Sequence, residues 1–301
     1  VFWVMCGVAV LAVVLVWSFA RESTADETPK MDWLGAILLS AAFLAAYLAI
    51  NEIEKLAGAN WWLIAIEIVV AAVLFVIFWH VENAQKNPMV TTTYLKERRT
   101  WGLLLTTLLT MTGVFAVMNG IVPALAQDTS VGASMSADTV SLATLTPYAL
   151  VGLVFGPVAG VIASKMGYRS TLRGGLIVSA IAMVFGVFVC QSPHIWGLVV
   201  LSVVLGLSYA GTANIMLNGL GIVLSPEDNP GYLPGLNAGA FNLGAGLSYA
   251  ILYGVQQGFS DAHGATMGYT GAMIAGIILL VLAFLSSLLI PKPAQNAAEE
   301  H

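Results

Sequence analysis

Polar side chains that recur at helical spacing inside long apolar segments are the residues of this sequence best suited to binding a solute. Thr112, Phe115 and Asn119 fall on one face of a predicted helix. Two further stripes follow: Ser208, Thr212, Ile215 and Asn218, with Asn214 one turn before Asn218, and then Asn237, Phe241, Gly244 and Ser248. Polar groups are costly in a membrane interior and usually face the inside of a helical bundle, so we predict that these stripes line a substrate cavity. The alternative is that Asn and Thr join helices by hydrogen bonds.

Neutral amides beside aromatic rings suit small amphipathic organic substrates better than small ions. Glu67 is the one carboxylate well inside an apolar segment. A carboxyl group in apolar surroundings can bind and release a proton, so Glu67 is a candidate proton site. Two alternatives remain open, because Glu67 could instead pair with another helix or lie near the membrane interface.

The remaining reactive residues do not form an enzyme constellation. The four histidines fall in predicted loops or the tail, and the two cysteines, Cys6 and Cys190, lie in apolar segments. No metal-ligand spacing, phosphate loop or nucleophile elbow is present. We therefore predict that the protein is not an enzyme and has neither a metal nor a cofactor. The absence of a basic cluster also argues against a nucleic-acid partner.

Composition places these stripes on membrane-crossing helices. Of the 301 residues, 58% are hydrophobic and 9% are charged, and the mean hydropathy is +0.88. Soluble domains carry about 25% charged residues. Continuous apolar runs predict helices rather than barrel strands, and hence an all-α polytopic membrane protein in the lipid bilayer. The predicted spans are 1–20, 32–51, 60–79, 101–126, 139–164, 172–190, 194–224, 232–258 and 267–290.

The distribution of basic residues predicts the orientation of these nine spans. Of the 11 Lys and Arg residues, all except Lys55 fall on one side of the membrane. Because basic loops stay inside the cell, this side and the C-terminus are predicted to be cytoplasmic, in a multi-pass protein of the cell membrane. The chain begins in an apolar run without Met or a basic segment, from which we expect further helices upstream. A complete nine-helix protein with an external N-terminus is the alternative.

Glycines at four-residue intervals indicate faces on which helices can approach closely. One set is Gly152, Gly156 and Gly160, and another is Gly235 and Gly239. Small residues at this spacing typically allow close packing or sliding of membrane helices. We therefore predict packing contacts at both sets.

Four short motifs occur in a characteristic order along the chain. They are Val1-Phe2-Trp3-Val4, Asp32-Trp33-Leu34-Gly35, Asn87-Pro88-Met89-Val90 followed by Tyr94-Leu95 and Arg98-Arg99, and Asn242-Leu243-Gly244-Ala245-Gly246-Leu247. In this order they resemble the 14-helix drug:proton antiporter branch of the major facilitator superfamily. The resemblance implies that 1–20 is the last helix of an N-terminal half and that 21–100 holds two extra central helices and a cytoplasmic linker. It further implies a C-terminal six-helix half at 101–290, and the tail 291–301 is predicted to be disordered.

The segment from Gly160 to Arg169 resembles the superfamily's Gly-x-x-x-Asp-Arg-x-Gly-x-Arg loop. The resemblance implies a cytoplasmic gating loop comprising Gly160, Ser164, Lys165, Gly167 and Arg169. Ser164 replaces the Asp and Lys165 replaces the first Arg, which would weaken a charge-based latch. Phe241 is a further departure, because relatives often have Arg there. The alternative is that Lys165 and Arg169 only set the topology.

The function implied by this resemblance is secondary active transport. We expect proton-coupled efflux of amphipathic organic compounds by alternating access, with substrate binding near the midplane. The main proton-coupling acids are then expected upstream, since Glu67 lies in an extra helix. The alternatives are a metabolite transporter of the same superfamily and a non-transporting membrane scaffold or assembly component.

Overall fold

The computed structural model describes residues 2–19, 32–53, 55, 58–85, 92–227 and 229–292, and all regular structure within them is helical. The elements, with η for π-helix, are α1 (Phe2–Phe19), α2 (Trp33–Ile53), α3 (Trp61–Ala84), α4 (Thr92–Leu95), α5 (Arg98–Ala116), η2 (Val117–Ile121), α6 (Val122–Gln127), α7 (Ala137–Val140), η3 (Ser141–Leu145), α8 (Thr146–Met166), α9 (Tyr168–Gln191), α10 (Ile195–Leu205), η4 (Gly206–Ala213), α11 (Asn214–Val223), α12 (Tyr232–His263) and α13 (Ala265–Ser287). The all-α class is confirmed. The motif at Asn87-Pro88-Met89-Val90 and the predicted disordered tail beyond residue 292 lie outside the described residues.

Eight helical runs in the described part of the chain are long and apolar enough to cross a membrane. They are α2, α3, α5–η2–α6, α7–η3–α8, α9, α10–η4–α11, α12 and α13. The shorter apolar helix α1 fits a ninth span, in agreement with the predicted number. Hydropathy predicted these spans to within a few residues, because a membrane helix needs about 20 apolar residues to satisfy its backbone in lipid.

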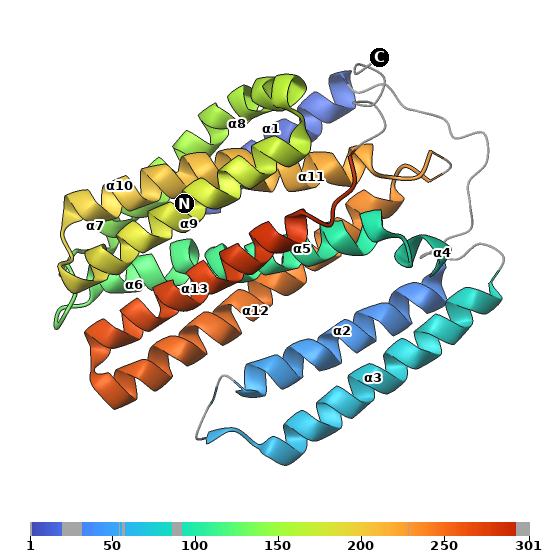
Figure 1. The fold of residues 1–301 in the computed structure, drawn as a ribbon, viewed down its shortest axis with the longest axis horizontal. Helices are drawn as coiled ribbons and strands as arrows, with labels where there is room; N and C mark the ends of the chain where they lie inside the picture. The colour runs from blue at the N-terminus through green and yellow to red at the C-terminus, as the bar shows by residue number, and fades with distance from the viewer. Residues whose placement is uncertain are drawn as a thin grey trace.

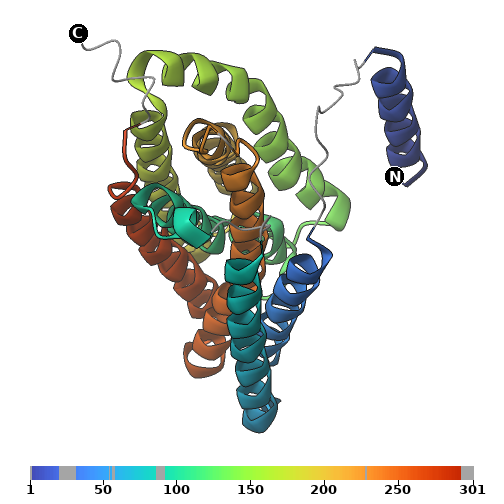
Figure 2. The same ribbon diagram turned by 90° about the vertical axis from the view of Figure 1, so that its right-hand side faces the viewer.

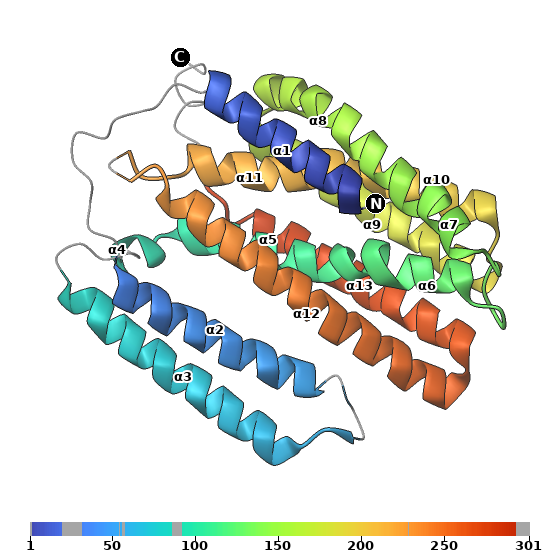
Figure 3. The ribbon, with the colours of Figure 1, turned by 180° about the vertical axis from the view of Figure 1, so that it is seen from behind.

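The helices run roughly side by side, with α2 and α3 forming a hairpin next to α12 (Figures 1 and 3). The run α5–η2–α6 packs against both α12 and α13, and α13 also packs against α9. Figure 2 shows α1 standing apart from the rest of the bundle. Arg98, Lys165, Arg169 and Arg173 lie at helix termini that meet at one end of the bundle, which we call the basic end.

Acidic residues close the α2–α3 hairpin at both of its ends. At one end, Gln85 Nε2 donates to Asp32 Oδ1 at 2.9 Å. At the other, the Asn60 backbone N–H donates to Glu52 Oε1 at 3.1 Å, and Lys55 forms an ion pair with Glu52. These contacts hold the two helices in register where their apolar faces alone would permit sliding.

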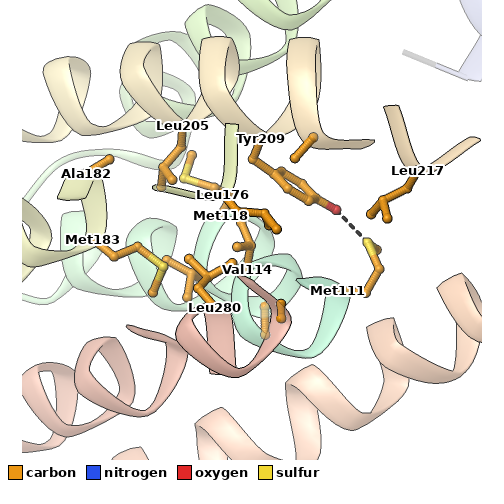
Figure 4. Packing of buried hydrophobic residues seen from close by; sticks show 14 of the residues in the cluster. Met111, Val114, Met118, Leu176, Ala182, Met183, Leu205, Tyr209, Leu217 and Leu280 are labelled. Atoms are coloured by element: carbon orange, nitrogen blue, oxygen red, sulfur yellow. Dashed lines mark hydrogen bonds between the residues drawn. The ribbon is translucent and has the colours of Figure 1, made fainter. Parts of the chain in front are cut away.

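The core shared by the helices from α5 to α13 is largely apolar and contains the hydroxyl group of a buried tyrosine. Met111, Leu176, Met183 and Leu205 are almost fully buried (Figure 4). The Tyr209 hydroxyl donates to the Met111 sulfur in the same cluster (Figure 4). A buried hydroxyl without a partner would destabilise the fold, so this contact lets a tyrosine occupy the core.

Three π-helical segments, η2, η3 and η4, interrupt the described spans, and the sequence did not predict them. A π segment shifts the hydrogen-bond register, so side chains must satisfy backbone groups nearby. Ser248 of α12 does so for η2, because the Ala116 backbone N–H donates to Ser248 Oγ at 2.9 Å. In η4, the Thr212 hydroxyl donates to the Leu207 carbonyl oxygen at 2.8 Å.

Candidate solute-binding site

Aromatic rings from two helices meet beside an exposed amide. Phe115 and Asn119 lie one turn apart on α5–η2, and Asn119 is exposed. Tyr249 of α12 meets Phe115 edge to face, with ring centroids 6.0 Å apart. Tyr253, one turn further along α12, stacks on Tyr249 at 5.9 Å. We call these four residues the aromatic–amide cluster.

Gly120 allows this cluster to form. A Cβ atom at Gly120 would lie 2.4 Å from the Tyr253 hydroxyl oxygen, so a larger residue would displace the ring from its position against η2. The Asn119 amide nitrogen donates to the Phe115 carbonyl oxygen at 2.9 Å. The Asn119 side-chain oxygen has no partner among the described residues, so it can accept a hydrogen bond from a solute.

Sequence reasoning named Phe115 and Asn119 but missed Tyr249 and Tyr253. Their spacing of four residues places both rings on one helix face, and this signal was available in the sequence. The prediction for α12 rested on its polar stripe instead.

Asn218 presents a second exposed amide, on α11. Its amide nitrogen donates to the Asn214 carbonyl oxygen at 2.9 Å and to the Asn214 side-chain oxygen at 3.2 Å. At a rise of 1.5 Å per residue, Asn218 lies about 8 Å from the basic end of its helix, and Asn119 lies about 12 Å from the opposite end of its own. In helices of about 45 Å, the two amides are therefore separated by about 25 Å in depth. They cannot contact one small solute at the same time.

Two residues of the predicted stripe on η4 face another helix. Ser179 of α9 donates its hydroxyl to Ser208 Oγ at 2.9 Å, and Gly175 of α9 lies against the Thr212 methyl group. Ile215 faces Gly156 of α8. The stripe assumed one continuous α-helix, whereas η4 is π-helical and has more residues per turn.

The predicted stripe on α12 forms the contact between α12 and α5. Asn237 is 1% exposed and accepts a hydrogen bond from the Thr107 hydroxyl at 2.6 Å. Its amide nitrogen donates to the Leu217 carbonyl oxygen at 3.4 Å. Gly244 lies against α5 in the same contact. Asn237 thus joins helices by hydrogen bonds, the alternative that sequence analysis left open.

The other two predicted cavity residues differ in their exposure. Thr112 is buried, and its hydroxyl donates to the Leu108 carbonyl oxygen of its own helix. Phe241 is half-buried on α12 and packs against the hydrophobic core.

The candidate gating loop is a sharp turn between α8 and α9. Gly167 ends α8 and precedes α9, with a φ of 82° that side-chain-bearing residues rarely adopt. The Ser164 hydroxyl donates to the Val161 carbonyl oxygen at 2.8 Å. Lys165 is exposed at this end. A Cβ atom at Gly160 would meet no other atom within 4 Å, so Gly160 makes no close contact with another described helix.

Three arginines from two helices, α5 and α9, approach one another beside this loop. Arg169 interacts electrostatically with Arg98 and Arg173. The Arg173 guanidinium donates to the Ser287 carbonyl oxygen of α13 at 3.1 Å. The Nε atoms of Arg169 and Arg173 are buried without a partner among the described residues. Arg169 therefore contributes to a positive cluster in addition to any effect on topology.

Glu67 is half-buried in α3, and its Oε2 atom has no hydrogen-bond partner among the described residues. It lies on α3, which packs chiefly against α2, whereas the aromatic–amide cluster is formed by α5, η2 and α12. The structure therefore does not bring the candidate proton site and the exposed amides together.

Asp128 connects two elements at the end of the bundle opposite the basic end. Its Oδ1 atom accepts hydrogen bonds from the Ser130 hydroxyl at 2.7 Å, the Ser130 N–H at 2.8 Å and the Val131 N–H at 3.2 Å. Its Oδ2 atom accepts from the Tyr269 hydroxyl of α13 at 3.1 Å. These hydrogen bonds, chiefly those from Ser130, lower the pKa of the Asp128 carboxyl.

The described chain is thus a bundle of helices long and apolar enough to cross a membrane, with exposed amides on two of the runs. The chain belongs to the Major Facilitator Superfamily, whose family model matches residues 103–300. This family consists of transporters, so the chain is not an enzyme.

Two kinds of curated relative are similar to this chain. The uridine/deoxyuridine transporter of Lactococcus lactis subsp. cremoris (strain MG1363) is 54% identical over 97% of this chain and 62% of its own length. The methyl viologen resistance protein SmvA of Salmonella typhimurium is 26% identical over 77% of this chain and 45% of its own length. The chain thus spans less than two thirds of the length of these relatives.

Proposed function

We propose that the chain forms part of a transporter for a small polar metabolite of the nucleoside class. The observation that carries the proposal is the aromatic–amide cluster. Phe115, Tyr249 and Tyr253 offer a surface on which a nucleobase can stack, and Asn119 offers amide groups for the polar edge of the base. The 54% identity to a protein named as a uridine/deoxyuridine transporter supports this substrate class.

This proposal takes up the metabolite alternative in place of drug efflux, the main prediction from sequence. Efflux of amphipathic organic compounds remains the second candidate, supported by the 26% identity to a methyl viologen resistance protein. Membership of the 14-helix drug:proton antiporter branch belongs to this second candidate. The aromatic rings of the cluster would serve either substrate, whereas an amide pairs only with a solute that has hydrogen-bonding groups.

Alternating access and proton coupling complete the proposal. In it, residues 101–290 form one six-helix half, the basic end faces the cytoplasm of a cell-membrane protein, and the loop at Lys165 and Arg169 gates that side. Glu67 binds a proton in this scheme, because its carboxyl has a buried oxygen without a described partner. Asn214 and Asn218 line the path nearer the basic end.

Uptake in a bacterial strain that lacks its own nucleoside transporters tests the proposed substrate class. Cells that express the protein as its gene encodes it should accumulate labelled uridine, and a protonophore should abolish this accumulation. Excess unlabelled nucleosides should compete, whereas methyl viologen should not. The efflux candidate would replace this proposal if cells with the protein took up no more uridine than cells without it and also excluded methyl viologen in a protonophore-sensitive way.

A further inference from the structure

A groove of about 680 Å³ lies between the α2–α3 hairpin and the helices α5 and α12. We call it the hairpin groove. Leu39 and Phe43 of α2 and Phe75 of α3 form one wall, while Trp101 and Leu105 of α5 contribute to the other. Its volume is in the range of sites that hold a drug-sized ligand.

Three glycines at four-residue intervals make the α12 side of the groove deep. They are Gly231, Gly235 and Gly239, and each lines the groove. A Cβ atom at any of the three would meet no other atom within 4 Å. The predicted packing contact at Gly235 and Gly239 is therefore not made within the described chain. By contrast, a Cβ atom at Gly152 would lie 2.7 Å from the Ala210 Cβ, as expected for close packing.

The chemistry of the groove favours a hydrocarbon occupant. Its walls are formed by leucine, phenylalanine, tryptophan and glycine on helices that can cross a membrane, with polar groups only near the basic end, from Asn229 and Tyr232. An apolar space open to a bilayer is filled by acyl chains at little cost, whereas water there would lose hydrogen bonds. The groove thus matches the tail of a lipid.

The end of the groove carries exposed positive charge. Lys96 adjoins Leu95, which lines the groove, and Arg98 lies one turn before Trp101 on α5. Both Lys96 and Arg98 are exposed and have no ion pair among the described residues, whereas Arg99 is paired with Glu97. Basic residues at a membrane surface attract anionic headgroups by about 1 kcal/mol each.

We propose that the hairpin groove is a binding site for an anionic phospholipid. One acyl chain occupies the space beside Gly235 and Gly239, and the phosphate of the headgroup lies at Lys96 and Arg98. The lipid fills the gap between the hairpin and the six-helix unit. This site is separate from the aromatic–amide cluster and does not depend on the transported solute.

Native mass spectrometry of the purified protein, after detergent exchange and addition of phosphatidylglycerol, tests the site. Leucine at position 239 should fill the groove without a clash, so Gly239→Leu should lower lipid retention about tenfold. The matched control is Gly258→Leu on the same helix, where a Cβ atom also meets open space outside the groove. This control should retain lipid like the wild type. Thermal melting of both variants checks that the fold is intact.

A second pair of variants tests the headgroup. Lys96→Gln with Arg98→Gln should remove the preference for phosphatidylglycerol over phosphatidylcholine while leaving retention of both measurable. Equal lipid retention by Gly239→Leu and Gly258→Leu would overturn the proposal, as would a wild-type protein that retains no lipid. An unchanged lipid preference in the double Gln variant would overturn the assigned headgroup position. Uridine uptake is not a readout here, so failure of the lipid site and failure of the proposed function are distinguishable.

Discussion

Asn119 combines an exposed amide with an aromatic surface assembled from two helices. Its own amide nitrogen is anchored on the Phe115 carbonyl oxygen, which fixes the direction of the side chain. One turn earlier on the same run, the Phe115 ring meets Tyr249 edge to face. A fixed amide loses little rotamer freedom when it binds, so its hydrogen bond contributes more to affinity.

Replacing Asn119 with alanine should weaken nucleoside transport with little effect on stability. Loss of one hydrogen bond to the solute costs about 1 kcal/mol, which corresponds to roughly a fivefold rise in the apparent KM for uridine uptake. The matched control is Asn83→Ala, since Asn83 is also exposed and donates to the carbonyl oxygen four residues before it. An equal effect of both variants would show that Asn119 has no special role.

The sequence predicted Asn119 as a binding residue but did not predict the tyrosine side chains Tyr249 and Tyr253 near it. Asn119 was recognisable because a polar side chain in a span is rare and costly. Asn237 satisfied the same criterion, yet it is buried between helices and bonded to Thr107 and Leu217. Side-chain type alone does not distinguish an exposed amide that can bind a solute from a buried amide that joins helices, because the distinction depends on which helix packs against each face.

Among the elements, the short connections at the helix ends position the spans. Asp128 joins the end of α6 to α13 through the Tyr269 hydroxyl and orders its own loop through Ser130. Hydrogen bonds to the ionised carboxyl lower its pKa in the folded state. The contribution of Asp128 to stability is therefore fully present above the unfolded pKa of about 3.9 and is lost as the pH falls through the lowered folded value.

Asp128→Ala should lower the melting temperature at pH 7 and reduce the further loss of stability between pH 4 and pH 2. Melting curves of the detergent-solubilised protein at several pH values would measure both effects. Asp138→Ala is the control, because Asp138 is exposed at the same end of the bundle and its side chain makes no hydrogen bond that the structure describes. Identical pH profiles for wild type and Asp128→Ala would contradict the role of the loop.

Gly167→Ala should destabilise the α8–α9 turn by about 1–3 kcal/mol, because the φ of 82° is strained for any residue with a Cβ atom. Gly174→Ala in α9 is the matched control. Its Cβ atom would meet open space, and alanine is the better helix former by about 1 kcal/mol. Chemical unfolding should thus move the two variants in opposite directions, and equal stability would refute the strain argument.

The positions of the membrane-crossing helices were predictable from the sequence, whereas the π-helical segments within them were not. Continuous apolar runs indicated the helix positions because lipid enforces backbone hydrogen bonding along the whole span. The π segments depend on partners distant in sequence, such as Ser248 beside the Ala116 amide. The predicted stripe through Ser208 and Asn218 assumed uniform α-helical spacing across η4, where Ser208 is buried against Ser179 while Asn218 is exposed.

For the whole molecule, the structure places two different polar features at two depths of one bundle. The aromatic–amide cluster lies toward the end that carries Asp128, and Asn218 lies toward the basic end. In alternating access a solute passes from one end to the other, so binding groups at both depths are expected along its path. Membership of the Major Facilitator Superfamily fits this arrangement.

The most direct test is exchange of labelled uridine by the purified protein in liposomes. Vesicles loaded with unlabelled uridine should take up external labelled uridine well above empty-vesicle levels, and Asn119→Ala should reduce this counterflow while Asn83→Ala should not. That result would support both the proposed substrate class and the assigned site. Absence of counterflow by a correctly folded protein, with uridine and other nucleosides alike, would contradict the account.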